Sequence, residues 1–270
     1  MPELPEVETT RRGIEPHVKG CKVSKIIVRN ARLRWPIPKD LPELLENRKL
    51  YAIHRRGKYL LFEFSHGHLI VHLGMSGSMR VIKTKETHGK HDHVDIKFGN
   101  TTLRFNDPRR FGAILWEDGE IYDHKLLKHL GPEPLSDAFD AEYLYRHSRK
   151  RSQAVKSWIM DSKIVVGVGN IYANEALFSS GIHPLKAAQK LTKAQAMNLV
   201  KEIKDVLSKA IARGGTTLRD FVGGDGKPGY FAQELNVYGR GGEPCKSCGK
   251  KLTEKRLTQR STVYCTHCQK

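Results

Sequence analysis

The chain has 270 residues, 39% of them hydrophobic and 28% charged, which is typical of a globular protein of one large or two modest domains. No apolar run approaches the length of about 18 residues that a membrane-spanning helix needs, and the acidic, proline-containing N-terminus is unlike a signal peptide. The formal net charge of +18 is typical of proteins that bind nucleic acid, because each added Lys or Arg releases counterions from the polyanion.

The first predicted element is an amphipathic helix that begins within the opening MPELPEVETT. Proline suits the first turn of a helix, and the helix dipole stabilises acids there by about 0.3–1 kcal/mol each. Apolar residues recur at helical spacing from Leu4 to Val18. On these features alone, Glu3, Glu6 and Glu8 are ordinary first-turn acids.

Strand-like segments follow this helix and predict a largely antiparallel β domain. They are rich in β-branched and aromatic residues, and His66-Gly67 and Gly99-Asn100 have the composition of hairpin turns. The segments are residues 23–30, 50–64, 68–84, 93–107 and 111–118.

Beyond a Pro-, Gly- and acid-rich linker at residues 129–137, the pattern becomes helical. Residues 140–163 predict two helices that carry a cluster of Lys and Arg, and a glycine-punctuated turn then leads into a helix from about Asn170 to Gly181.

The clearest helix covers residues 191–215. Thr192 and Gln195 form a capping box at its start, and Gly214-Gly215 ends it. The following segment, 214–231, is glycine-rich without periodicity, which is typical of a functional loop.

Four of the five cysteines form the pattern C-x2-C-x16-C-x2-C at the end of the chain, as Cys245, Cys248, Cys265 and Cys268. This spacing predicts one zinc ion held by four thiolates, which leave no open coordination position, so the ion is structural. Two disulfides are the alternative, and a reducing compartment disfavours them. Cys21 stands apart, and we expect it to be a buried small hydrophobe.

Two other classes of protein can be equally basic. A membrane-surface protein would carry a basic amphipathic helix with an aromatic face, which the sequence lacks. A ribosome-associated or other RNA-binding protein stays open on charge alone. The His-rich segment 88–95 does not predict a second metal site, because alternation along a strand would divide its ligands between two faces.

The motifs PELPEVETTRRG, RRGKYLL, HLGMSGSMR, DPRRFG, VGVGNIYANEALF, GGTTLRDF and DGKPGYF, with the terminal zinc finger, resemble the bacterial formamidopyrimidine-DNA glycosylase family from end to end. Endonuclease VIII is similar in plan but typically differs after Glu3. The resemblance implies base-excision repair: removal of oxidised purines such as 8-oxoguanine and formamidopyrimidines, then cleavage of the abasic site by β,δ-elimination.

The fold that the resemblance implies is α+β with several domains. An N-terminal antiparallel β-sandwich with a flanking helix is expected over residues 1–133, and a linker with a first helix over 134–150. A helix-two-turn-helix DNA-binding domain is expected over 151–231, with a lesion-recognition loop at 214–231. A four-cysteine zinc-finger β-hairpin over 236–270 ends the chain.

Proline at position 2 has a chemical meaning in this family. If Met1 is removed, Pro2 becomes a secondary amine, and an α-amino group with a pKa near roughly 7.7–8.0 is partly unprotonated at neutral pH. Attack on the sugar C1′ gives an iminium that must be cationic, which is a strong electron sink for elimination. Glu3 would then move protons and stabilise positive charge beside this centre.

The resemblance also assigns Lys58 and Arg260 to catalysis. Lys58 would donate a proton during β-elimination, although a lysine at a strand edge is ordinarily a solvated charge. Arg260, expected at the turn of the zinc hairpin, would contact a phosphate and serve δ-elimination. Glu6 would support Pro2 or a water, or be only a first-turn acid.

Eight further residues are candidate DNA contacts: six match family positions, and His72 and Tyr238 are phosphate candidates. By residue type alone, Met75 and Phe111 would be core, Asn170 would cap a helix, and His91, Arg110 and Arg151 would be solvated. Met75, Arg110 and Phe111 match the family's trio that enters the DNA helix where the flipped nucleotide leaves a gap. One of the three wedges into the helix, one faces the orphaned base and one stacks. The eight are His91, Arg110, Arg151, Asn170, Met75, Phe111, His72 and Tyr238.

We therefore expect a cytoplasmic, nucleoid-associated monomer that acts on damaged double-stranded DNA, with one structural Zn2+, no small-molecule cofactor and no membrane partner. The alternative within the enzyme class is an endonuclease VIII-like glycosylase for oxidised pyrimidines. The alternative from another class is a non-catalytic, zinc-dependent nucleic-acid-binding protein, which would not need Pro2, Glu3 and Lys58 together.

Overall fold

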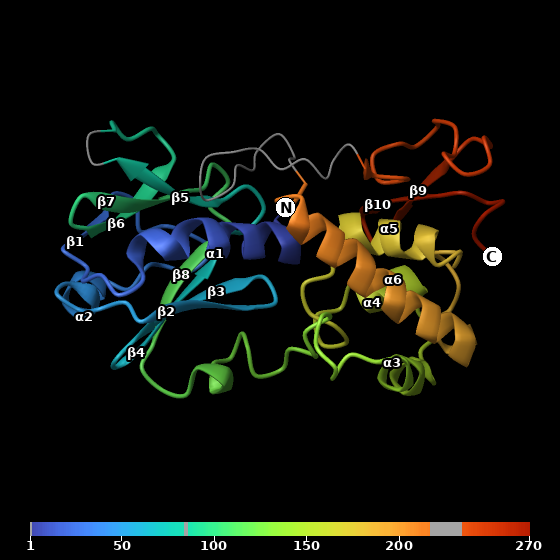
Figure 1. Cartoon of the computed structure of the whole chain (residues 1–270), viewed down its shortest axis with the longest axis horizontal. Helices are drawn as coiled ribbons and strands as arrows, with labels where there is room; N and C mark the ends of the chain where they lie inside the picture. Colours follow the sequence, from blue (N-terminus) through green and yellow to red (C-terminus); the bar gives the residue numbers. More distant parts are fainter. Residues whose placement is uncertain (1, 84–85, 217–233) are drawn as a thin grey trace. The chain divides into compact units, whose positions relative to one another are not determined.

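The structure is a computed structural model that describes residues 2–83, 86–216 and 234–270. The chain divides into two units (Figure 1). The first comprises Met1–Lys128 with Arg213–Ala232, and the second His129–Ala212 with Gln233–Lys270. The finer four-part division expected from the resemblance stays a prediction.

Two four-stranded antiparallel sheets form most of the first unit. The first sheet has the order β1-β6-β7-β5, made by Lys25–Val28, Asp92–Phe98, Thr101–Asn106 and Ser78–Lys83. The second has the order β2-β3-β4-β8, made by Ala52–Arg56, Tyr59–Phe64, Gly67–His72 and Ala113–Glu117. The short helix α2 (Leu41–Leu45) and the 3-10 turn η1 (Ile121–Asp123) lie outside the sheets.

The turns between strands refine the prediction. Gly99-Asn100 joins β6 to β7 as predicted, whereas the turn before β4 is Ser65-His66, one residue earlier than predicted, and Gly67 already belongs to the strand. The strand-like segment 50–64 is two strands, because Gly57-Lys58 forms a tight turn between β2 and β3. Lys58 therefore lies on a hairpin turn.

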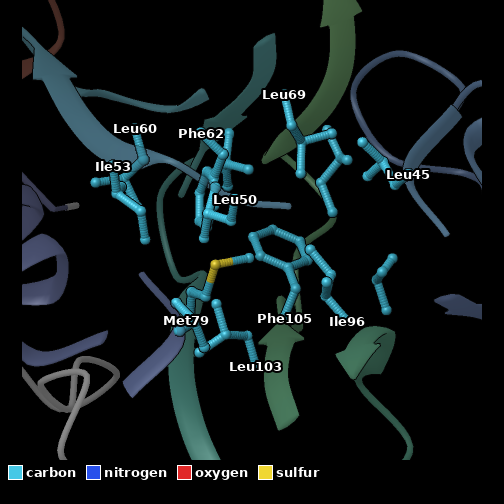
Figure 2. Packing of buried hydrophobic residues seen from close by; sticks show 14 of the residues in the cluster. Leu45, Leu50, Ile53, Leu60, Phe62, Leu69, Met79, Ile96, Leu103 and Phe105 are labelled. Atoms are coloured by element: carbon cyan, nitrogen blue, oxygen red, sulfur yellow. The ribbon is translucent and has the colours of Figure 1, made fainter. Parts of the chain in front are cut away.

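The two sheets share one hydrophobic core, so the first unit is a β-sandwich. Phe62 and Leu69 of one sheet and Met79 and Phe105 of the other belong to the same buried cluster (Figure 2). Alternation along each antiparallel strand sends these side chains inward.

Helix α1 (Leu4–Val18) lies where the sequence predicts it and contacts strands β2 and β5 (Figure 1). Its side chains Leu4, Val7, Ile14 and Val18 are fully buried. The Glu3 N–H donates to Glu6 Oε2 at 2.8 Å, which satisfies one backbone donor at the start of the helix.

The second unit is helical and ends in a hairpin. Its elements are α3 (Ala141–Ser148), α4 (Val155–Ile159), α5 (Asn170–Ser179), η2 (Ala188–Lys190), α6 (Lys193–Ala212), β9 (Thr253–Leu257) and β10 (Arg260–Tyr264). The predicted capping box of α6 is confirmed, because the Gln195 and Thr192 side chains each accept the other's backbone N–H, at 3.2 and 3.1 Å. No helix among the described residues is long and apolar enough to cross a membrane.

Candidate active site and nucleic-acid interface

The beginning of the chain is buried. Pro2 is buried, and Glu3 and Glu6 are each only 2% exposed. Besides the Glu3 N–H, Glu6 accepts the Thr216 N–H at 2.8 Å through Oε1. Glu6 therefore joins the N-terminal segment to the residues that follow α6, and it does more than an ordinary first-turn acid.

Gly215 makes this contact possible. Its φ is +80°, and a Cβ built on it would lie 3.1 Å from Glu6 Oε1. Glycine alone combines that backbone conformation with so close an approach. The Gly214-Gly215 pair, predicted as a helix terminator, therefore also lets Thr216 reach the carboxylate of Glu6.

A network of ion pairs holds the turn that carries Lys58. Arg55 donates through Nη1 to the Gly57 carbonyl at 3.0 Å and through Nε to Glu8 Oε2 at 3.1 Å. Glu8 also accepts from Arg11 and Arg12. Helix α1 thus fixes the Gly57-Lys58 turn through Arg55.

The environment of Glu8 differs from that of a solvated helix acid. Glu8 is only 8% exposed. Burial by itself would raise the pKa of Glu8, but the hydrogen bonds from Arg11 and Arg12 and the charge of Arg55 lower that pKa to about 2. Glu8 is therefore a permanent anion that anchors Arg55.

His72, at the end of β4, belongs to the same part of the sandwich. Its ring lies against that of Tyr59, with the centroids 4.9 Å apart. Burial lowers the pKa of His72 to about 4, and the positive charges of Lys58 and Arg34 add to the effect. Because Nδ1 accepts the Gly74 N–H at 3.0 Å, the neutral ring carries its proton on Nε2 as a donor.

Met75, Arg110 and Phe111 lie on loops at the ends of strands and are exposed. Met75 is 38% exposed and Phe111 45% exposed, although residue type alone predicts core positions for both. The guanidinium of Arg109 lies 5.0 Å from the centroid of the Phe111 ring. Exposed apolar side chains next to arginines are suited to enter a DNA duplex.

Asp107 lies at the first position of the DPRRFG motif, and the sequence patterns did not single it out. It is fully buried, and its N–H donates to the carbonyl of His91, a half-exposed residue, at 3.0 Å. The sequence feature that could have identified Asp107 is a single acidic residue at the start of an arginine-containing turn.

The second unit carries Arg151, Asn170 and Tyr238. Arg151 is exposed just after α3. Asn170 is the first residue of α5 and not its N-cap as expected, because Gly169 takes the cap position with φ −118° and ψ −159°. The Tyr238 N–H donates to Glu175 Oε1 at 2.8 Å, and the buried Glu175 carboxylate also accepts two further backbone N–H groups.

Arg260 is exposed at the start of β10, directly after a turn in which Thr258 and Gln259 both have positive φ. Arg260 begins the second strand of the hairpin and pairs with Leu257 across the turn. Lys156 of α4 belongs to the cluster of Lys and Arg in residues 140–163, and it is only 1% exposed. Its Nζ donates to the carbonyl of Ser261, the residue next to Arg260, at 2.7 Å.

The four terminal cysteines come together. Their sulfurs all lie within 4.8 Å of one another. Cys245 Sγ is 3.9 Å from Cys268 Sγ, and Cys248 Sγ is 3.5 Å from Cys265 Sγ. A tetrahedral zinc ion with Zn–S bonds of about 2.3 Å separates its sulfurs by about 3.8 Å, so the cluster fits zinc.

Comparisons with known proteins cover almost the whole chain. The N-terminal domain model of formamidopyrimidine-DNA glycosylase matches residues 1–114, its H2TH domain model matches 130–222, and a zinc finger found in FPG and IleRS matches 242–270. A formamidopyrimidine-DNA glycosylase from Saccharophagus degradans is 70% identical over 271 residues, with both chains fully covered. The chain belongs to the formamidopyrimidine-DNA glycosylase family.

Solved structures agree. A Lactococcus lactis Fpg mutant in complex with Fapy-dG-containing DNA has a TM-score of 0.93 at 34% identity, with 99% of each chain covered. The MutM (Fpg) protein of Thermus thermophilus has a TM-score of 0.89 at 38% identity, with 99% of this chain and 98% of that chain covered. The predicted family, the α+β fold with its sandwich, helical part and zinc hairpin, and the enzyme class are confirmed.

Membership in the formamidopyrimidine-DNA glycosylase family makes this chain a DNA-repair glycosylase. The zinc-finger match and the four clustered thiols together give it one structural zinc ion, as predicted. Cys21 is exposed, so the prediction that it is buried is wrong: it lies in the chain segment just after α1, outside the core.

Proposed function

We propose that this glycosylase removes 8-oxoguanine and formamidopyrimidines from duplex DNA and then cleaves the abasic site by β,δ-elimination through a Schiff base on Pro2. The observation that carries the proposal is the buried start of α1, where Pro2 stands beside two almost fully buried carboxylates, Glu3 and Glu6. Sequence identities of 70% and 60% to formamidopyrimidine-DNA glycosylases over the full length favour oxidised purines as the substrate over the oxidised pyrimidines of endonuclease VIII.

The reaction begins at the Pro2 nitrogen once Met1 has been removed. Its lone pair forms a bond to C1′ of the damaged nucleotide, while the bond from C1′ to the base breaks and the base leaves with a proton. Glu3 stabilises the positive charge on the sugar and transfers a proton at the ring oxygen. Ring opening gives a cationic iminium between Pro2 and C1′.

Elimination follows from that cation. Loss of a proton from C2′ breaks the bond from C3′ to its phosphate oxygen, and a second elimination releases the phosphate on C5′. Lys58, held on its turn by Arg55, supplies the proton in the first elimination. Arg260 binds a phosphate and serves the second elimination.

Two groups of residues hold the DNA. Met75, Arg110 and Phe111 fill the gap left by the flipped nucleotide, and their exposure supports this role. The remaining residues bind the backbone, and neutral His72 donates through Nε2–H. These backbone-binding residues are His72, His91, Arg151, Asn170 and Tyr238.

The place of action is the bacterial cytoplasm in association with the nucleoid. A repair glycosylase needs chromosomal DNA, and a net charge of +18 favours binding to DNA of any sequence. Co-sedimentation of the protein with isolated nucleoids, lost at high salt, tests this assignment.

The decisive experiment is borohydride trapping with a duplex that carries 8-oxoguanine opposite cytosine, followed by mass mapping of the adduct. We expect the adduct on Pro2. The Pro2→Gly variant, whose primary amine still reacts, should bind DNA but form the adduct more slowly. An adduct on another residue would disprove the role of Pro2. Trapping only with an oxidised-pyrimidine duplex would reassign the lesion range, and tight binding with no adduct in any duplex would indicate a binding protein.

A further inference from the structure

The residues proposed to fill the DNA gap come from two separate loops. Met75 lies in the wedge loop, residues 73–77, between β4 and β5, and Arg110 and Phe111 lie in the arginine turn, residues 107–112, between β7 and β8. An exposed side chain that enters DNA has to be held by buried groups beneath it. The carboxylate of Asp107 is such a group for both loops.

Asp107 is 0% exposed and binds both loops through its side chain. Oδ1 accepts the hydroxyl of Ser76, in the wedge loop next to Met75, at 2.9 Å. Within its own turn, Oδ1 accepts the Arg109 N–H at 3.3 Å and Oδ2 accepts the Gly112 N–H at 2.7 Å. The carboxylate thus binds the residue that follows Met75 and the residues on either side of the Arg110-Phe111 pair.

The backbone of Asp107 adds a third segment. Its N–H donates to the His91 carbonyl at 3.0 Å, and its carbonyl accepts from the Arg110 N–H at 3.2 Å and from His93 Nε2 at 2.8 Å. Arg110, which has φ +55°, is held in the left-handed region by these bonds around it. The backbone groups of His91 and Arg110 are therefore both hydrogen-bonded to Asp107.

The two loops also meet backbone to backbone. Gly74 has φ +67°, and a Cβ on it would lie 2.5 Å from both the Gly112 nitrogen and the Phe111 carbonyl carbon. A Cβ on Gly112 would lie 2.7 Å from Phe105 Cζ. So close a contact leaves little freedom for one loop to move without the other.

We propose that Asp107 is a positioning residue that holds the wedge loop and the arginine turn as one rigid element before DNA binds. This inference rests on the proposed function of Met75, Arg110 and Phe111. Because the three side chains are presented in place, less conformational freedom is lost when they enter the duplex, and extrusion of the damaged base is faster. Elimination at an abasic site in single-stranded DNA, where no paired base is extruded, does not need Asp107.

The main test uses Ser76→Ala, which removes the hydroxyl that bridges the loops and leaves the bonds within the arginine turn. In single-turnover assays we expect excision of 8-oxoguanine opposite cytosine to slow about tenfold, as for loss of one hydrogen bond to a charged group. Cleavage of an abasic site in single-stranded DNA should stay within about twofold of wild type. Ser65→Ala, in the exposed turn before β4, is the matched control and should change neither rate.

Two further variants complete the test. Asp107→Asn keeps the shape but removes the charge and one acceptor, and it should slow excision more than Ser76→Ala. Ser76→Ala combined with Met75→Ala should slow excision by less than the product of the two single effects, because part of what the bridge does is to place Met75. Thermal melting of each variant shows whether it is folded. If Asp107→Asn is unfolded, the excision rate of Ser76→Ala decides whether Asp107 positions the two loops.

Three results would overturn the inference: unchanged excision by folded Ser76→Ala, equal slowing on the duplex and on single-stranded abasic DNA, or additive effects of the Ser76 and Met75 substitutions. Unchanged excision by Met75→Ala alone would overturn the wedge role itself, and with it the proposal for Asp107. Trapping of the wild-type adduct is independent of all of these and tests the chemistry separately.

Discussion

The two units hold their proposed catalytic side chains by different means. In the first unit, Lys58 and the start of α1 rest on a β-sandwich with a large buried core and are fixed by hydrogen bonds and ion pairs. In the second, Arg260 stands on a two-stranded hairpin over a small cluster that includes Phe178, Val237 and Leu252. A hairpin of this size is marginal without a cross-link. We therefore expect the zinc ion to stabilise the hairpin of Arg260, as the large hydrophobic core stabilises the sandwich that carries Lys58.

The largest expected effect is that of removing the metal. Cys248→Ala, or chelation of the zinc, should unfold the hairpin and lower excision by about 100-fold or more, because structural zinc contributes of the order of 10 kcal/mol to the folding of small fingers. The sandwich should remain folded. Zinc content, circular dichroism and single-turnover excision measure these effects. Cys21→Ala, which changes an exposed cysteine outside the cluster, is the control. Full excision by zinc-free protein would remove the distinction between the units.

The corresponding change in the first unit is Arg55→Ala. It removes the bond to the Gly57 carbonyl and should slow strand cleavage at a preformed abasic site about tenfold, because Lys58 loses its fixed turn. Arg12→Ala is the matched control, since Arg12 also binds Glu8 but its side chain is 60% exposed and lies on α1, away from the Gly57 carbonyl that Arg55 holds. Equal slowing by both variants would show that the charge around Glu8 matters and the turn contact does not.

A smaller effect is expected in the pH dependence of stability. The folded-state pKa of Glu8 is about 2, below the ordinary value of 4.5, so its ion pairs stabilise the fold fully above pH 4.5 and lose their effect as the pH falls towards 2. Glu8→Gln should lower the free energy of unfolding by about 1–2 kcal/mol at pH 7, allowing for solvent screening, and by less at about pH 3. Urea unfolding at several pH values measures the difference. A pH-independent difference would mean that the ion pairs are not its source.

The smallest effect concerns Arg260 as a single phosphate contact. Arg260→Ala should reduce the slope of log K against log salt by about 0.9, the value for one phosphate of duplex DNA. Binding to an uncleavable abasic-site analogue at several salt concentrations gives the slope. An unchanged slope would leave Arg260 without a phosphate contact, and the zinc hairpin would need another explanation.

Local patterns predicted most of the elements, because helix caps, turns and metal spacing depend on neighbouring residues. The capping box of α6 and the four zinc thiolates are examples. The pattern missed one local feature, the Gly57-Lys58 turn that divides β2 from β3. It failed where long-range packing decides: it counted Lys156, which is buried, with the basic cluster of residues 140–163, and it expected Cys21 in the core. Burial depends on which distant elements meet, and no spacing along the chain records that.

The candidate site shows the same division. Residue type and motif resemblance selected Pro2, Glu3, Lys58 and Arg260. The sequence alone shows that these residues offer an amine nucleophile, a carboxylate and two cations. What residue type and resemblance did not select were the residues that hold functional side chains in place. Arg55 holds the turn of Lys58, Lys156 binds the backbone next to Arg260, and Asp107 binds the loops of Met75 and Arg110.

The sequence by itself determined the family, the zinc ligands and the chemistry available at the N-terminus, since these depend on residue identity and spacing. The tertiary structure decided that Glu6 binds the backbone after α6, that Glu8 anchors the turn of Lys58, and that Asp107 binds Ser76 in a loop 31 residues away. Such contacts depend on how the sandwich brings distant segments together. Their strength comes from burial, which strengthens a hydrogen bond to a charge and makes its loss costly.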